Sequence, residues 1–224
     1  MKVSLSFNSS SSEDVAIMVD VLRASTTINV AMGNFKEIIP VKGIEEAQIL
    51  AKSKNNSVLA GERRGSAIEG FDTGNSPIEI SNFSGDVLVI TTSNGTRIME
   101  GINAKILIGS FVNAKAVARE ALNLAESHID IVMAGVEGRF AIEDFLGAGE
   151  IISNLKDHKL DEKALAACMA SVNNSMVDNA VKNSRSARRL AEIGLSKDVD
   201  FCLKRNIYDH VPVYVNGSIT GKKE

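Results

Sequence analysis

Apolar runs of strand length recur along this chain. Three of them are almost continuously apolar, as in parallel strands covered on both faces: residues 15–21, 86–91 and 129–134. Weaker patterns predict further strands at residues 2–7, 37–41, 57–60, 105–108 and 211–215. We expect residues 2–7 to form an edge or half-exposed strand because their polarity alternates. Residues 211–215 are expected at an edge because Pro212 cannot donate a hydrogen bond to a central ladder.

Stretches of helical periodicity separate these strands. The predicted helices cover residues 25–32, 44–54, 113–127, 143–155 and 197–203, and residues 161–193 are helical with a break near 173–174. Strands that alternate with helices favour an α/β fold, with a mainly parallel or mixed sheet, helices on both faces and a helical C-terminal segment. Because no linker or repeat divides the sequence, we expect a single domain over residues 1–224.

Composition excludes several classes of function. The chain has 224 residues, a formal net charge of −3 and 4% aromatic residues without Trp. Without a basic field or stacking platforms, it is not expected to bind nucleic acid. No apolar run approaches the ~18 residues of a membrane-spanning helix, so we expect a cytoplasmic protein that does not bind membranes. Nothing in the sequence fixes the oligomeric state, and a homodimer stays open because small α/β enzymes are often dimers.

Polar residues gather directly after four predicted strands. Asp20 ends the first of these strands and is followed by Arg23, Ser25 and Thr26. The other three loops hold Glu62, Arg63 and Arg64; Ser93, Asn94, Gly95, Thr96 and Arg97; and Glu137, Arg139, Glu143 and Asp144. Ligands of open α/β sheets bind beyond the carboxyl ends of the strands, so these loops predict one common site.

The residue types in these loops indicate an anionic ligand. Five of the ten arginines lie there, and arginine suits planar, multidentate recognition of oxyanions. The carboxylates would repel one another around an anion unless a cation lay among them, and oxygen ligands without His or Cys favour Mg²⁺. The structural alternative is that Asp20 caps a turn and pairs with Arg23, while Glu143 and Asp144 offset the dipole of a following helix.

The loop motifs also occur along the chain in the same order as the motifs of a known family. They are Val19-Asp20-Val-Leu-Arg23-Ala-Ser25-Thr26-Thr27, Gly61-Glu62-Arg63, the segment 70–77, the segment 92–97, and Glu143-Asp144 with Ala148-Gly149. In these stretches the chain resembles the 2-phosphosulfolactate phosphatase family, the ComB proteins of coenzyme M biosynthesis. The resemblance implies a Mg²⁺-dependent hydrolysis of 2-phospho-3-sulfolactate to 3-sulfolactate and phosphate. Residues after 155 carry no motif that matches the family.

We infer the roles of single residues from their chemistry and place. The residues expected to take part in catalysis are Asp20, Arg23, Glu62 and Asn94. Those expected to bind substrate are Ser25, Thr26, Arg63, Ser93, Gly95, Thr96, Arg97 and Arg139. Those expected to hold Mg²⁺, directly or through its waters, are Asp20, Glu62 and Asp144.

Other functions stay open at this point. The substrate could be a related anionic phosphoester. An aspartyl-phosphate mechanism of the haloacid-dehalogenase type would use Asp20 as nucleophile, but it expects a second Asp where this chain has Leu22. A non-catalytic module that binds a sulfonate or a phosphorylated metabolite would need the arginines but not the acids.

Overall fold

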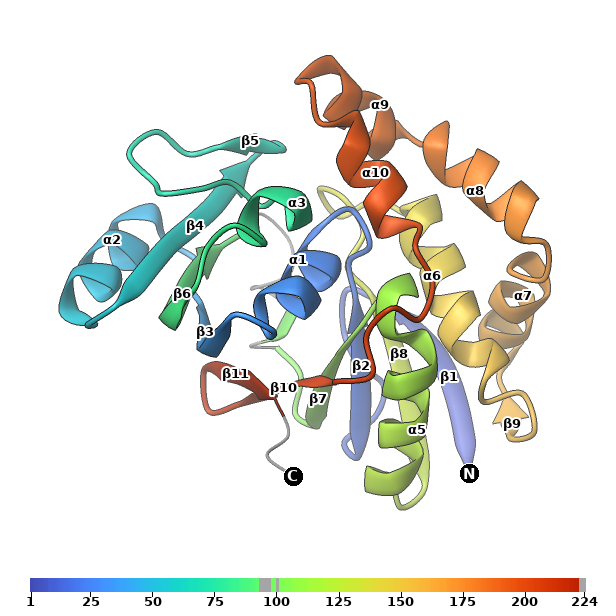
Figure 1. Ribbon diagram of the computed structural model, residues 1–224. Coiled ribbons are helices and arrows are strands. Elements are labelled where there is room, and N and C mark those ends of the chain that lie inside the picture. Colours follow the sequence, from blue (N-terminus) through green and yellow to red (C-terminus); the bar gives the residue numbers. More distant parts are fainter. Residues whose placement is uncertain (93–97, 100, 222–224) are drawn as a thin grey trace.

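Eleven strands form one sheet in the described part of this computed structural model, residues 1–92, 98–99 and 101–221 (Figure 1). The strands are β1 (Lys2–Phe7), β2 (Val15–Val19), β3 (Phe35–Pro40), β4 (Ser57–Arg63), β5 (Ser66–Ala67), β6 (Gly85–Thr91), β7 (Lys105–Gly109), β8 (His128–Met133), β9 (Lys159–Leu160), β10 (Pro212–Val215) and β11 (Ser218–Gly221). Every strand predicted from an apolar run is present, with bounds shifted by a few residues.

Helices fill the intervals between the strands. They are α1 (Ala24–Ala31), α2 (Ile44–Ser53), α3 (Pro77–Ile80), α5 (Ala114–Leu124), α6 (Ile142–Ser153), α7 (Glu162–Ala170), α8 (Asn174–Lys182), α9 (Arg185–Glu192) and α10 (Ser196–Cys202), with a 3₁₀ turn η1 (Phe111–Asn113). The side chains of Asp161, Asn173 and Ser184 accept hydrogen bonds from the first turns of α7, α8 and α9. These caps break the predicted helical stretch 161–193 into three helices.

Two parallel blocks of strands meet at an antiparallel hairpin. The order across the sheet is β5-β4-β6-β3-β11-β10-β7-β2-β8-β1-β9. β4, β6 and β3 run parallel to one another, as do β7, β2, β8, β1 and β9. The hairpin β10–β11 is antiparallel to β7 on one side and to β3 on the other. The predicted mixed α/β sheet is therefore confirmed.

The predicted edge position of residues 211–215 is wrong. β10 lies inside the sheet, between β11 and β7. Pro212 is the first residue of this strand, where a missing N–H is tolerated, and the ladder to β7 begins one residue later at Val213. That ladder joins only two residue pairs, and the ladder from β11 to β3 joins one. The two parallel blocks are thus connected by short ladders, and they stand at an angle to each other in Figure 1.

The strand β2 shows why its sequence is continuously apolar. All five of its residues are buried. Ile17 and Val19 pack into a hydrophobic cluster with residues of α5 and α6, whereas Ala16 and Met18 pack into a second cluster with residues of α1. Helices therefore cover both faces of the parallel block, as predicted. No helix in the described residues has the length and apolar character that crossing a bilayer requires.

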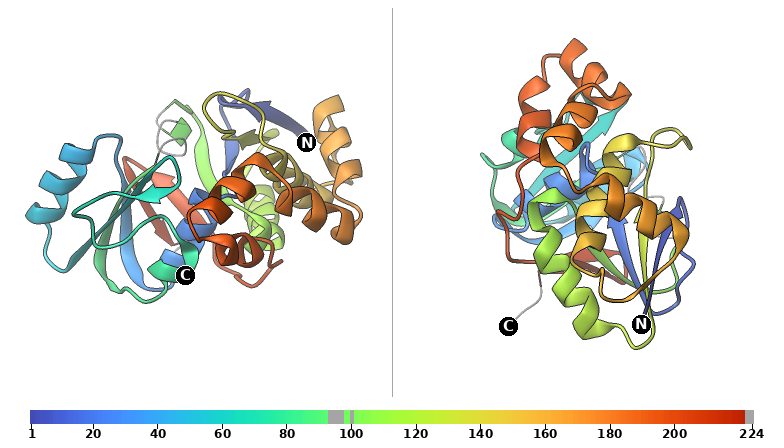
Figure 2. Two further views of the ribbon diagram at one scale, coloured as in Figure 1. Left: turned by 90° about the horizontal axis from the view of Figure 1, so that it is seen from above. Right: turned by 90° about the vertical axis from the view of Figure 1, so that its right-hand side faces the viewer.

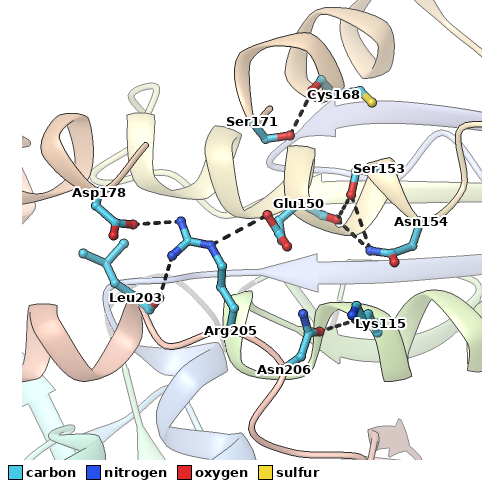
Figure 3. Close-up of polar contacts among 10 residues, drawn as sticks. All are labelled: Lys115, Glu150, Ser153, Asn154, Cys168, Ser171, Asp178, Leu203, Arg205 and Asn206. Atoms are coloured by element: carbon cyan, nitrogen blue, oxygen red, sulfur yellow. Dashed lines mark hydrogen bonds and ion pairs between the residues drawn. The ribbon is translucent and has the colours of Figure 1, made fainter. Parts of the chain in front are cut away.

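The C-terminal helices cross the molecule and return to its centre. In Figure 2, seen from above, α9 and α10 lie between the two halves of the molecule. Arg205, just after α10, fixes this return: its Nη2 donates to Asp178 Oδ1 at 2.8 Å and its Nε lies 3.9 Å from Glu150 Oε2 (Figure 3). The guanidinium carbon also lies 5.1 Å from the centre of the Phe111 ring. Arg205 thus joins the end of the helical segment to α6, α8 and η1.

Candidate active site

A cavity of about 170 Å³ lies where loops from both parallel blocks meet helix α9. Its wall comes from the ends of β2, β4, β6 and β8, the segment before α3, and α9. The lining residues are Asp20, Leu22, Arg23, Glu62, Arg64, Gly65, Asn75, Thr92, Val136, Glu137, Arg139, Arg185, Ser186, Arg189 and Leu190. The structure thus brings four of the predicted site residues together, namely Asp20, Arg23, Glu62 and Arg139.

Asp20 is a buried acid on this wall. Burial, together with the charges of Glu62 and Glu143, raises the pKa of its carboxyl to about 7, although the Ala24 N–H and Arg23 act to lower it. The Ala24 N–H donates to Asp20 Oδ1 over a long 3.3 Å. At neutral pH the carboxyl therefore holds a proton for much of the time unless a cation lies beside it.

Asp144 is a second buried acid, but its surroundings differ. Its Oδ1 accepts a hydrogen bond from the Val21 N–H and its Oδ2 accepts one from the Gly135 N–H, both at 2.8 Å. Burial raises its pKa well above the ordinary value, and the charges of Asp20 and Glu143 add to that effect. Asp144 is not part of the cavity wall. It ties the loop after β2 to the loop after β8.

Arg23 is committed to partners inside the protein. Its Nη1 donates to Asp198 Oδ2 at 2.7 Å and its Nη2 donates to the Gly65 carbonyl oxygen at 2.6 Å. Asp198, on α10, also accepts a hydrogen bond of 2.6 Å from the Ser76 hydroxyl. The side chains of Arg23 and Asp198 are each only 2% exposed. This buried ion pair fixes one guanidinium edge of Arg23 and joins the loop after β2 to the C-terminal helices.

Three other predicted binding residues do not line the cavity. Ser25 Oγ accepts from the Asp20 N–H at 2.9 Å, and Thr26 Oγ1 donates to the Val21 carbonyl at 3.1 Å, so both buried hydroxyls shape the loop after β2. Arg63 donates to the Lys42 carbonyl at 2.9 Å and to Thr91 Oγ1 at 3.0 Å. The next residue, Arg64, lies in the turn after β4 with a φ of 56°, and it lines the cavity instead.

The predicted loop after β6 is only partly described. Ser93, Asn94, Gly95, Thr96 and Arg97 lie outside the described residues, so their assignments stay predictions. The residue before them, Thr92, lines the cavity, and its buried Oγ1 has no hydrogen-bond partner in the described part of the chain.

Sequence reasoning missed the contribution of the C-terminal helices. Arg185 and Arg189 of α9 line the cavity, and Asp198 of α10 holds Arg23. Five of the lining residues are arginines, whereas three are acids. The signal available in the sequence was the spacing of Arg185 and Arg189, which places both on one face of a helix.

The predicted three-carboxylate metal site is not assembled in this structure. Within residues 1–92, 98–99 and 101–221, no three His, Cys, Asp or Glu side chains form a group that could hold a metal ion. Asp144 uses both carboxylate oxygens for backbone amides. Asp20 and Glu62 do lie on the cavity wall and repel each other. They fit the usual form of a Mg²⁺ site, in which one or two carboxylates are joined by waters and substrate phosphate.

Comparison with known proteins assigns the chain to a family. The family model described as 2-phosphosulpholactate phosphatase matches residues 3–217. The chain belongs to the 2-phosphosulpholactate phosphatase family. A 2-phosphosulfolactate phosphatase of Methanothermobacter thermautotrophicus is 49% identical over 219 residues, which is 98% of this chain and 95% of that protein. A probable 2-phosphosulfolactate phosphatase of Thermotoga petrophila is 43% identical over 90% of this chain and 89% of its own length.

Membership in the 2-phosphosulpholactate phosphatase family confirms the resemblance that the loop motifs carried. The match runs from β1 into the turn between β10 and β11. It therefore includes α7 to α10, for which the sequence showed no family motif. Helix α9, which lines the cavity, and Asp198, which pairs with Arg23, belong to the part of the chain that the family model matches.

Proposed function

We propose that the protein hydrolyses 2-phospho-3-sulfolactate to 3-sulfolactate and phosphate in a Mg²⁺-dependent reaction, as in coenzyme M biosynthesis. One observation carries the proposal: a single cavity joins buried, mutually repelling carboxylates with five arginines. The relative from Methanothermobacter thermautotrophicus is a 2-phosphosulfolactate phosphatase, which supports hydrolysis of this phosphate ester. In that reaction water adds to phosphorus, the bond between phosphorus and the ester oxygen breaks, and the alcohol takes up a proton.

The arginines match the charge of this substrate. Phosphate, carboxylate and sulfonate groups on a three-carbon chain require several cations at close range. Arg23 is held rigid by Asp198 and by the Gly65 carbonyl, so it can meet charge on the phosphoryl oxygens without reorganising. Arg64, on the next loop, and Arg139 line the same cavity. Guanidinium groups that converge on one small space favour a ligand with more than one acidic group.

The carboxylates account for the proposed cation. Asp20 and Glu62 are the acids that would hold Mg²⁺, which when bound neutralises phosphoryl oxygens and orients a water. Glu62 is fixed by the Gly65 N–H, which donates to its Oε2 at 2.7 Å. Burial and the charge of Glu62 raise the pKa of Asp20, and a cation held between the two carboxylates would offset both effects.

The test is phosphate release by purified protein. With 2-phospho-3-sulfolactate and Mg²⁺ the protein should release phosphate, and EDTA should stop the release. Asp20→Asn should lose both the activity and the response to Mg²⁺ while its thermal unfolding stays cooperative. Asp157→Asn, an exposed acid outside the cavity, is the matched control and should behave as wild type.

Two results would contradict the proposal. Normal Mg²⁺-dependent turnover by Asp20→Asn would make Asp20 structural and remove the metal assignment. Binding of 3-sulfolactate by wild type, without phosphate release from any phosphoester, would favour a binding module instead.

A further inference from the structure

Helix α9 presents one face to the cavity. Arg185, Ser186, Arg189 and Leu190 all line it, and the spacing of these positions places them on a single side of the helix. Ser184 caps the helix by accepting a hydrogen bond of 3.1 Å from the Ala187 N–H. The face is therefore set by the helix itself and not by a loop.

Contacts on two sides fix this helix over the cavity. Toward β4, a methyl group added to Gly65 would lie 3.5 Å from Ile193 and 3.8 Å from Leu190, so the turn after β4 packs directly against the end of α9. Toward β8, Arg189 Nη1 lies 3.8 Å from Glu137 Oε1. Helix α9 therefore spans from the loop of one parallel block to the loop of the other.

The two arginines of α9 differ from Arg23 because neither forms a short ion pair with an acid of the described residues. Arg185 forms no ion pair with any described residue, and the ion pair of Arg189 is long, with a partner side chain that is 65% exposed. Like charges four residues apart on a helix repel each other. Two such cations on one cavity wall therefore favour an anion between them.

We propose that Arg185 and Arg189 bind the sulfonate of the substrate and make α9 the specificity-determining element, an inference that rests on the proposed function. The phosphoryl group is assigned to the part of the wall with Asp20, Glu62 and Arg23. Of the four other arginines on the wall, Arg185 and Arg189 share one helix face and suit a single anionic group, whereas the other two lie on separate loops. A sulfonate has three oxygens and stays charged at all relevant pH values. Two guanidinium groups can share those oxygens, whereas one guanidinium already satisfies a carboxylate.

The test compares two substrates that differ only in the sulfonate. The values of kcat/KM for 2-phospho-3-sulfolactate and for phospholactate are measured with wild type, Arg185→Gln and Arg189→Gln. The ratio of the two values should fall at least about tenfold in each variant, which corresponds to about 1.4 kcal/mol. Arg188→Gln is the matched control because Arg188 is exposed on the same helix and does not line the cavity. Its ratio should equal that of wild type.

The other outcomes distinguish failure of the sulfonate assignment from failure of the proposed phosphatase function. An unchanged ratio in both α9 variants, or an equal loss on both substrates, would show that α9 does not read the sulfonate. If wild type hydrolyses neither substrate, the proposed phosphatase function fails. Calorimetric binding of 3-sulfolactate then decides the inference separately. Weaker binding by at least about tenfold in Arg185→Gln and Arg189→Gln, but not in Arg188→Gln, would support it, and equal binding would overturn it.

Discussion

The ion pair between Arg23 and Asp198 links the cavity to the C-terminal helices, and Asp198→Asn tests what it contributes. The substitution keeps the shape of the side chain and removes its charge. In the folded protein the carboxylate accepts from Arg23 at 2.7 Å and from the Ser76 hydroxyl at 2.6 Å, and both charged side chains are 2% exposed. After the change, the guanidinium of Arg23 remains buried without its ion-pair partner.

The expected cost follows from this burial. Removing one member of a buried ion pair typically costs about 3–5 kcal/mol, because the remaining charge cannot return to water. An asparagine oxygen still accepts one hydrogen bond, so we expect a loss near the lower end, about 3 kcal/mol. With a urea m-value of about 1–3 kcal/mol per molar, the unfolding midpoint should fall by at least about 1 M. Phosphate release should fall as well, because Arg23 loses the contact that orients it.

The assay is equilibrium unfolding in urea, with an exposed ion pair between α8 and α10 as control. Lys182 Nζ lies 2.7 Å from Asp200 Oδ1, and these side chains are 53% and 64% exposed. Asp200→Asn should therefore change the free energy of unfolding by less than about 1 kcal/mol. If Asp198→Asn also loses less than this, the buried pair does not stabilise the fold. A double variant Arg23→Leu with Asp198→Leu should lose less stability than the two single changes added together.

Two further changes test how the fold is held away from the cavity. The backbone N–H groups of Ser127 and His128 lower the pKa of Asp14, so its stabilisation is present above the unfolded-state value near 3.8 and is lost as pH falls through the folded-state value. Asp14→Asn should be less stable than wild type in urea at pH 7, and a difference that persists unchanged at pH 3 would refute this account. Arg205→Ala should lower the free energy of unfolding by about 1–3 kcal/mol because it removes a charged hydrogen bond to Asp178 and leaves the half-buried Glu150 without its nearest cation. Arg205→Lys should restore part of the loss, and equal stability of all three proteins would contradict the assignment.

The parts of the fold that depend on local pattern could be predicted from the sequence. The run that forms β2 is apolar at every position because helices cover both of its faces. Such a run can be recognised as a strand from neighbouring residues alone. The position of β10 could not be predicted in the same way. Pro212 reads as an edge signal, but its effect depends on whether it begins the strand or interrupts the ladder, and pairing alone decides that.

In the candidate site, too, some features follow from local sequence and others depend on tertiary packing. Asp20 directly follows β2 and Glu62 lies near the end of β4, so the rule that ligands bind at the carboxyl ends of strands predicts that they share one site. The choice between Arg63 and Arg64 depends on where β4 ends and its turn begins, and the sequence did not predict that boundary. Asp198 lies 175 residues from Arg23, and only tertiary packing joins them.

The two buried acids, Asp20 and Asp144, differ in how far hydrogen bonds within the protein offset the cost of their burial. Asp144 receives backbone hydrogen bonds of 2.8 Å at both oxygens, so its burial is offset by donors that belong to the loops it ties together. Asp20 receives a single bond of 3.3 Å from the described backbone, and Glu62 and Glu143 raise its pKa further. Folding therefore leaves the less compensated charge on the cavity wall, where a cation and a substrate would approach. An acid whose burial is offset only by a ligand contributes less to stability than to binding, and the difference between Asp20 and Asp144 supports the proposed division into a functional and a structural carboxylate.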